Sequence, residues 1–200
     1  MGERPPGPLN DKLVRWTRAY DAFGDNYRLF GTEGITPYDV IQGAIGDCWF
    51  MSAASAMAEV PGRMEAIFLN KSEDDRLNKA GVYAVNFYTL GVPHTVVIDD
   101  HLPLMPSKPQ PKPLNNTIEE ETGQPEVELQ RTLFARAGVD GSLWGAFLEK
   151  AFAKYHGNFK HIEGGDPRKA VLTLYGSPFV TYQHHPEFKF GGTVEPLNVS

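Results

Sequence analysis

The residues around Cys48, the single cysteine of this 200-residue chain, have types and spacing that could support acyl transfer. Gln42 precedes Cys48 by six positions, with Gly43, Gly46 and Asp47 between them. Unpaired N–H groups and the helix dipole stabilise a thiolate in the first turn of a helix. The Gln42 amide and the Cys48 N–H could then donate to the oxyanion that forms when the thiolate attacks a peptide carbonyl.

A helix beginning at Cys48 would place the thiol in that position. Residues 48–58 are rich in alanine, which favours helix, and Pro61 and Gly62 provide a stop. Asp47 is a preferred N-cap type, so its side chain is expected to accept from an N–H of the next turn. The alternative is that Cys48 is a small core residue, which is the commoner role of a lone cysteine in an apolar helix.

The remaining segments predict further helices and one β-hairpin. Apolar residues recur at helical spacing in two stretches, and two runs of alternating or β-branched residues flank a Gly-Val-Pro turn. A stretch rich in proline and glutamate cannot bury enough apolar surface to order itself. The predicted elements are helices over 12–23, 143–155 and from Asp166-Pro167 to Gly176, a hairpin over 81–90 and 95–98, and an exposed insertion over 106–130.

The composition excludes several classes of protein. A hydrophobic content of 41% with 12% aromatic residues predicts a globular core, and the net charge of −6 gives no basic surface for nucleic acid. No apolar run approaches the roughly 20 residues that span a bilayer, so no transmembrane segment is expected. A single cysteine excludes an internal disulfide and favours a reducing, cytoplasmic location.

The motif from Gln42 to Trp49 resembles the active-site signature of the calpain family, Gln-Gly-x-x-Gly-Asp-Cys-Trp. The resemblance continues in order over about 30–178, through 81–103 and 143–159 to Glu163-Gly164-Gly165. It implies an α+β, papain-like fold, of which this chain is the N-terminal (nucleophile) lobe, with core helices and a small antiparallel sheet. The implied divisions are a 1–29 extension with a short helix, a 30–182 protease-core lobe and a divergent 183–200 tail.

The resemblance also implies a function: calcium-dependent endopeptidase activity on protein substrates. By this resemblance, Cys48 is the nucleophile and Gln42 is an oxyanion-hole donor. The resemblance also places the Gly164–Gly165 loop alongside the substrate. Glycines there let a peptide backbone approach closely. Taken alone, Gly164–Gly165 also fits an ordinary turn.

A general base for Cys48 is harder to find in the sequence. His184 and His185 lie 136 and 137 residues after Cys48, within the spacing of papain-type enzymes, but their neighbours do not match the calpain pattern. The base and its orienting Asn are therefore expected in a second lobe that the chain lacks, leaving little activity alone. The alternatives are a non-catalytic calpain-like protein that binds peptides or partners, and a small protease that uses His185.

The resemblance implies one calcium ion in this lobe, held by the Asp39 carboxylate and by backbone oxygens at Thr32 and Gly34. Ser142 stands where the family has a glutamate, which weakens the site or leaves water to fill it. Asp140 could reach in from two residues away. The alternative is that Asp39 is a loop or cap residue.

Overall fold

The computed structural model describes residues 14–71, 76–106 and 130–178. These residues form a mixed α+β structure with four α-helices, a two-stranded and a three-stranded antiparallel sheet, and several 3₁₀ turns. The predicted fold class is confirmed. The helices are α1 (Ala19–Phe23), α2 (Cys48–Ala58), α3 (Trp144–Tyr155) and α4 (Pro167–Tyr175), and the strands are β1 (Arg15–Arg18), β2 (Val82–Thr89), β3 (Val92–Asp99), β4 (His101–Pro106) and β5 (Gln130–Thr132).

The predicted helix over 12–23 is wrong in its first half. Residues Arg15–Arg18 form strand β1, which pairs antiparallel with β4 between Arg15 and Leu104 at one end and Arg18 and His101 at the other. Within the described part of this range, residues 14–23, only Ala19–Phe23 is helical. Pairing with a distant strand satisfies the backbone of these residues and outweighs a periodic pattern of side chains. Trp16 on β1 is 54% exposed, whereas Ala19 at the start of α1 is buried and Tyr20 and Phe23 pack against the core.

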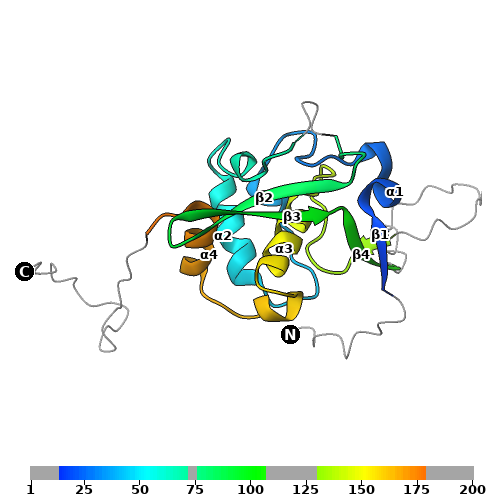
Figure 1. The fold of residues 1–200 in the computed structure, drawn as a ribbon. Coiled ribbons are helices and arrows are strands. Elements are labelled where there is room, and N and C mark those ends of the chain that lie inside the picture. Colours follow the sequence, from blue (N-terminus) through cyan, green and yellow to red (C-terminus); the bar gives the residue numbers. More distant parts are fainter. Residues whose placement is uncertain (1–13, 72–75, 107–129, 179–200) are drawn as a thin grey trace, which may run out of the picture.

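The predicted hairpin is confirmed as β2 and β3, which pair from Val82 with Asp99 to Thr89 with Val92. Its predicted turn at Gly91-Val92-Pro93 is wrong, because Val92 and Pro93 already belong to β3. Leu90 and Gly91 form the two-residue turn, and both have positive φ, 51° and 79°. Such a turn matches the right-handed twist of the strands that it joins. The hairpin crosses in front of α2 and α3 in Figure 1.

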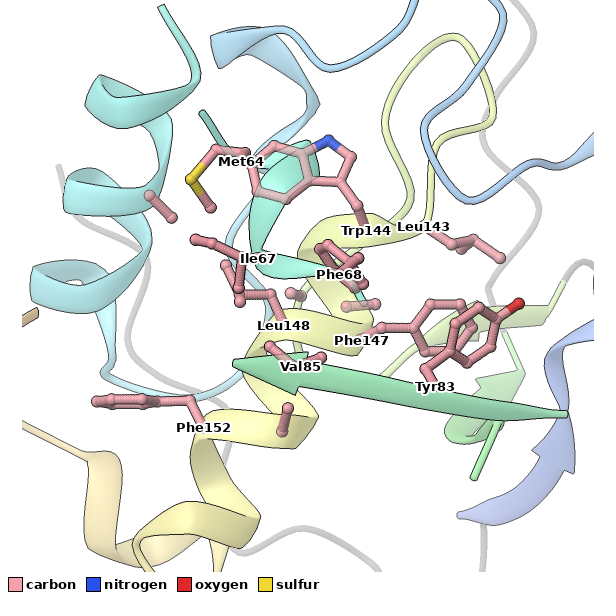
Figure 2. Close-up of a cluster of buried hydrophobic side chains, with 14 of the residues drawn as sticks. Met64, Ile67, Phe68, Tyr83, Val85, Leu143, Trp144, Phe147, Leu148 and Phe152 are labelled. Carbon is pink, nitrogen blue, oxygen red and sulfur yellow. The ribbon is translucent and has the colours of Figure 1, made fainter. Parts of the chain in front are cut away.

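The core lies where α3 packs against β2 and α2. Figure 2 shows Tyr83 and Phe147 pointing toward one another between β2 and α3, and their ring centroids are 4.4 Å apart. Phe50 of α2 stacks on Phe152 of α3 at 3.7 Å. Helix α3 buries residues on nearly every side, which is typical of a central helix. The start of α2 is therefore fixed to a rigid body.

The last described helix has the predicted boundaries. Asp166 caps α4 by accepting from the Arg168 N–H at 3.0 Å, and Gly176 ends it with φ of 71°. The predicted insertion lies almost entirely outside the described residues, although Pro106 and Gln130 at its two ends pair between β4 and β5. The predicted 183–200 tail also lies outside them. Among the described helices, none is long and apolar enough to cross a membrane.

Candidate active site

Cys48 is the first residue of α2, as predicted, and its side chain is exposed. The Asp47 carbonyl accepts from the N–H groups of Phe50 and Met51, at 2.8 and 3.1 Å. The helix buries Phe50, Met51 and a series of small residues against the core, which leaves Cys48 on its solvent side. The alternative that Cys48 is a core residue is wrong.

The segment that leads into α2 brings Gln42 close to the helix start. Gln42 is exposed, and its Nε2 donates to the Ile45 carbonyl at 2.7 Å. A Cβ on Gly43 would overlap the Phe134 carbonyl, so only glycine allows the two backbones to approach this closely. Gly43 therefore allows the segment before Cys48 to pack closely against the backbone of Phe134.

Trp49 joins the Cys48 helix to the Gly164–Gly165 segment. Its indole Nε1 donates to the Ile162 carbonyl at 2.9 Å, and its ring fills the space that a side chain on Gly165 would need. The Gly164 N–H donates to the Gly46 carbonyl at 2.8 Å. The exposed backbone of Gly164 and Gly165 therefore lies directly beside the loop that presents the thiol.

The side chain of Asp47 does not cap α2, so that part of the prediction is wrong. Asp47 is fully buried, and its carboxyl interacts with that of Glu149 on α3, which is 1% exposed. Glu149 Oε2 accepts from the Ala135 N–H at 2.8 Å. Burial raises the pKa of Asp47, and burial together with the charge of Asp47 raises the pKa of Glu149 to about 9.

No histidine among residues 14–71, 76–106 and 130–178 forms a hydrogen bond with Cys48. The His101 ring bonds to Asp99, and the His161 Nδ1 lies 2.9 Å from the His156 carbonyl. Partial desolvation of the His156 ring, at the C-terminal end of α3, lowers the pKa of His156, with a contribution from His161. His184 and His185 lie outside the described residues. The described part of the chain thus holds a thiol, a nearby amide and an exposed glycine segment.

Comparison with known proteins decides the family. Residues 4–191 match the family described as calpain family cysteine protease. The chain belongs to the calpain family. It is 34% identical over 179 residues to the calpain-type cysteine protease DEK1 of Arabidopsis thaliana, covering 87% of this chain and 7% of that protein. It is 28% identical over 176 residues to rat calpain-5, covering 86% of this chain and 23% of that protein.

A third relative covers the whole of this calpain-family chain. The calpain of Schistosoma mansoni is 27% identical over an aligned length of 209 residues, and the alignment covers 100% of this chain and 24% of that protein. The chain therefore spans less than a quarter of the length of these three relatives.

The residues that the calpain resemblance assigns to calcium lie in the loop before α2. Asp39 is 5% exposed, and its Oδ2 accepts from the Trp144 Nε1 at 2.9 Å and from the Thr36 N–H at 2.7 Å. Its Oδ1 accepts from the Thr36 hydroxyl at 2.9 Å. Asp39 thus has the role of a cap residue, which the sequence left open.

Thr32, another position of the expected calcium loop, bonds to Asp140. Its Oδ2 accepts from the Thr32 N–H at 3.0 Å and its Oδ1 from the Ser142 N–H at 3.1 Å. Gly34, further along this loop, has φ of 78°. Ser142 is buried, and its hydroxyl oxygen has no hydrogen-bond partner among the described residues. Within the described ranges, no group of three acidic, histidine or cysteine side chains is placed to hold a metal.

Proposed function

We propose that this chain is the nucleophile lobe of a cysteine endopeptidase that cleaves internal peptide bonds of proteins. The observation that carries the proposal is the exposed Cys48 at the first residue of α2, between Gln42 and the Gly164–Gly165 segment. The Cys48 thiolate would add to the peptide carbonyl carbon and form an acyl-enzyme as the amine leaves with a proton from the base. Water would then hydrolyse the thioester and restore the thiol.

Two donors are available for the oxyanion in this proposal. A glutamine amide carries two N–H bonds, so the bond from Gln42 to the Ile45 carbonyl leaves one of them free. The N–H of Cys48 is one of the first N–H groups of α2, which have no acceptor within the helix. Both donors belong to segments held by backbone contacts, which reduces the reorganisation needed as negative charge develops.

The exposed backbone of Gly164 and Gly165 would run beside the substrate in this proposal. The contacts of Trp49 with the Ile162 carbonyl and with Gly165 support this placement of the substrate, because they hold the glycine segment beside the start of α2. A second protease-core lobe would supply the histidine base and its orienting asparagine, so the chain alone would turn over little substrate. The lone thiol favours a reducing, cytoplasmic compartment.

Calcium has no step in the proposed mechanism, because the residues do not fit the ion in this arrangement. Calcium requires six to eight oxygen ligands, usually with more than one free carboxylate. The Asp39 carboxylate is buried and accepts three hydrogen bonds, while that of Asp140 accepts from backbone N–H groups on both sides. Binding at Asp39, Thr32 and Gly34 would require these bonds to break, so any calcium dependence is expected to be weak.

Peptide hydrolysis tests the proposal. The chain is mixed with the second lobe of a calpain relative, and cleavage of a fluorogenic peptide is measured. Cys48→Ala is expected to abolish turnover, and Gln42→Ala to lower kcat by about 10²–10³ through loss of one oxyanion donor. Ser52→Ala, on the exposed side of the same helix, is the matched control and should leave turnover unchanged. Undiminished cleavage by the Cys48→Ala variant would contradict the proposal.

A second candidate is a calpain-like protein that binds peptides or partners without cleaving them. The observation that favours it is that none of the described histidines bonds to Cys48. It predicts equal peptide binding by the parent chain and by Cys48→Ala, and no turnover by either chain with or without the added lobe. Turnover that depends on Cys48 would exclude it.

A further inference from the structure

Two buried carboxyl groups meet immediately before the thiol. Asp47 is 0% and Glu149 1% exposed, and they come from the start of α2 and the middle of α3. Neither oxygen of Asp47, nor Oε1 of Glu149, accepts from any N–H or hydroxyl group among the described residues. The two carboxyls interact directly, since each one alters the pKa of the other. Two ionised carboxylates in this position would repel one another in an environment that also penalises each charge.

We propose that Asp47 and Glu149 share one proton, and that this carboxyl–carboxylate pair positions the start of α2, and hence Cys48, against α3. One proton turns two of these three acceptor oxygens into a donor and an acceptor, so one oxygen of each side chain gains a hydrogen-bond partner. The proton also reduces the magnitude of the total charge of the pair, from −2 to −1. The pair acts through the backbone around Cys48 and does not touch substrate, so the inference stands whether or not the chain cleaves peptides.

The pair also reaches the segment that carries Gln42. Glu149 Oε2 accepts from the Ala135 N–H at 2.8 Å. On either side of Ala135, the Leu133 carbonyl accepts from the Ala44 N–H at 3.0 Å, and the Arg136 N–H donates to the Ile41 carbonyl at 2.8 Å. Residues 133–136 thereby hold the 41–44 segment beside α2. Through these hydrogen bonds, the proposed pair connects the start of α2 at Cys48 with the 41–44 segment, which carries Gln42, and with helix α3.

No charged side chain in the described part of the chain offsets the pair. Lys150, next to Glu149, donates to Asp99 at 2.8 Å and to the His101 carbonyl at 2.7 Å. Arg136 is exposed, as is the thiol of Cys48. Burial raises the pKa of both groups, and the interaction with Asp47 raises that of Glu149 further, whereas the hydrogen bond with Glu149 lowers that of Asp47. The proton of the pair is therefore expected mainly on Glu149.

The shared proton predicts an unusual dependence of stability on pH. A carboxyl whose pKa is higher in the folded than in the unfolded chain stabilises the fold fully below its unfolded pKa. That stabilisation is lost as pH rises to the folded value. For Glu149 these limits are about 4.5 and about 9. Between them the folding equilibrium constant should fall about tenfold per pH unit, because unfolding releases one proton.

The test measures urea unfolding of the 200-residue chain at several pH values between 5 and 10, together with its infrared spectrum. We expect the decline described above, and a C=O band of a protonated carboxyl at pH 7 that disappears as pH rises through about 9. In Asp47→Asn/Glu149→Gln both carboxyls are replaced by amides that can still pair, so this band and this decline should be absent. Glu59→Gln, an exposed residue at the far end of α2, is the matched control and should retain both.

Alkylation of Cys48 separates positioning from simple stability. At a pH and temperature where every variant is folded, Glu149→Gln should react with iodoacetamide at the parent rate, because its amide can donate to Asp47. Glu149→Ala should react several-fold more slowly, because the helix start is then no longer held. Equal rates for these two variants would overturn the positioning role.

The parent chain alone decides whether the proton is shared, even if the variants do not fold. Absence of the carboxyl band at pH 7, or stability that does not decline between pH 5 and 9, would overturn the proposal. Persistence of both signals in the double amide variant would overturn it equally.

Discussion

The start of α2 and the loop around Asp39 both carry groups that could react or bind, but the two regions leave those groups in opposite states. Cys48 is exposed, and within the described residues no hydrogen bond engages its thiol. Asp39 is buried and accepts from Trp144 and Thr36. The difference teaches that the availability of a side chain, rather than its chemical type, separates a candidate reactive group from a structural one.

The largest effect should come from Asp39. Asp39→Ala leaves the fully buried Trp144 N–H and the Thr36 donors without an acceptor. Because each unsatisfied buried donor costs about 1–3 kcal/mol, the free energy of unfolding should fall by about 3 kcal/mol. Urea unfolding measures the loss. The smaller change Asp39→Asn keeps one oxygen for Trp144 and should lose less. A loss below about 1 kcal/mol for Asp39→Ala would contradict the structural role that separates Asp39 from the exposed Cys48.

A smaller effect is expected from Trp49, which holds the Gly164–Gly165 segment beside the Cys48 helix. Trp49→Phe removes the donor to the Ile162 carbonyl and should lower the free energy of unfolding by about 1 kcal/mol. Hydrogen exchange of the Gly164 N–H should become faster, because that loop is then less firmly held. Trp16→Phe is the matched control, since Trp16 is 54% exposed on β1. If Gly164 exchanged at the same rate in both variants, Trp49 would not fix the loop.

The smallest effect concerns an exposed carboxylate. Partial burial opposes ionisation of Asp99, but hydrogen bonds from Lys150 and His101 prevail and lower its pKa to about 2. A lowered pKa stabilises the fold above the unfolded value of 3.8, and this stabilisation is lost as pH falls through about 2. Because the side chain is 60% exposed, Asp99→Asn should cost less than about 1 kcal/mol at pH 7.

Acid titration of unfolding in the parent chain and Asp99→Asn measures that contribution. The two curves should converge below about pH 2, where Asp99 is protonated in both states. A loss at pH 7 as large as that of Asp39→Ala would show that charge, rather than burial, sets the cost of removing a carboxylate.

Local signals predicted the elements that depend on nearby residues. The helix at Cys48, the core helix α3 and the α4 boundaries at Asp166 and Gly176 follow from residue types within a few positions. Strand β1 could not be predicted in this way, because its partner β4 lies more than 80 residues away. An amphipathic pattern of four residues cannot compete with a complete row of backbone hydrogen bonds.

The incorrect prediction that the Asp47 side chain caps α2 has the same cause, because local residue types do not reveal a distant partner. Its residue type favours a local N-cap, but its carboxyl faces Glu149, 102 positions away in the sequence. A signal for that burial was present in α3, where every neighbour of Glu149 on the same helix face is small or apolar. These neighbours at three and four positions are Gly145, Ala146, Phe152 and Ala153. A glutamate surrounded in this way indicates a buried carboxyl that needs a partner.

The reaction of Cys48 with a peptidyl epoxide tests the central claim most directly. Because the chain has one cysteine, the same thiol in the urea-unfolded chain is an internal reference. The rate constant at pH 7, measured by mass spectrometry, should be at least about tenfold higher in the folded chain, since a bound peptidyl probe would be held beside the exposed thiol. A non-peptidyl epoxide should show a smaller difference, because it makes no contact with the Gly164–Gly165 segment. Equal or slower labelling of the folded chain by the peptidyl probe would contradict the assignment of Cys48 as the nucleophile.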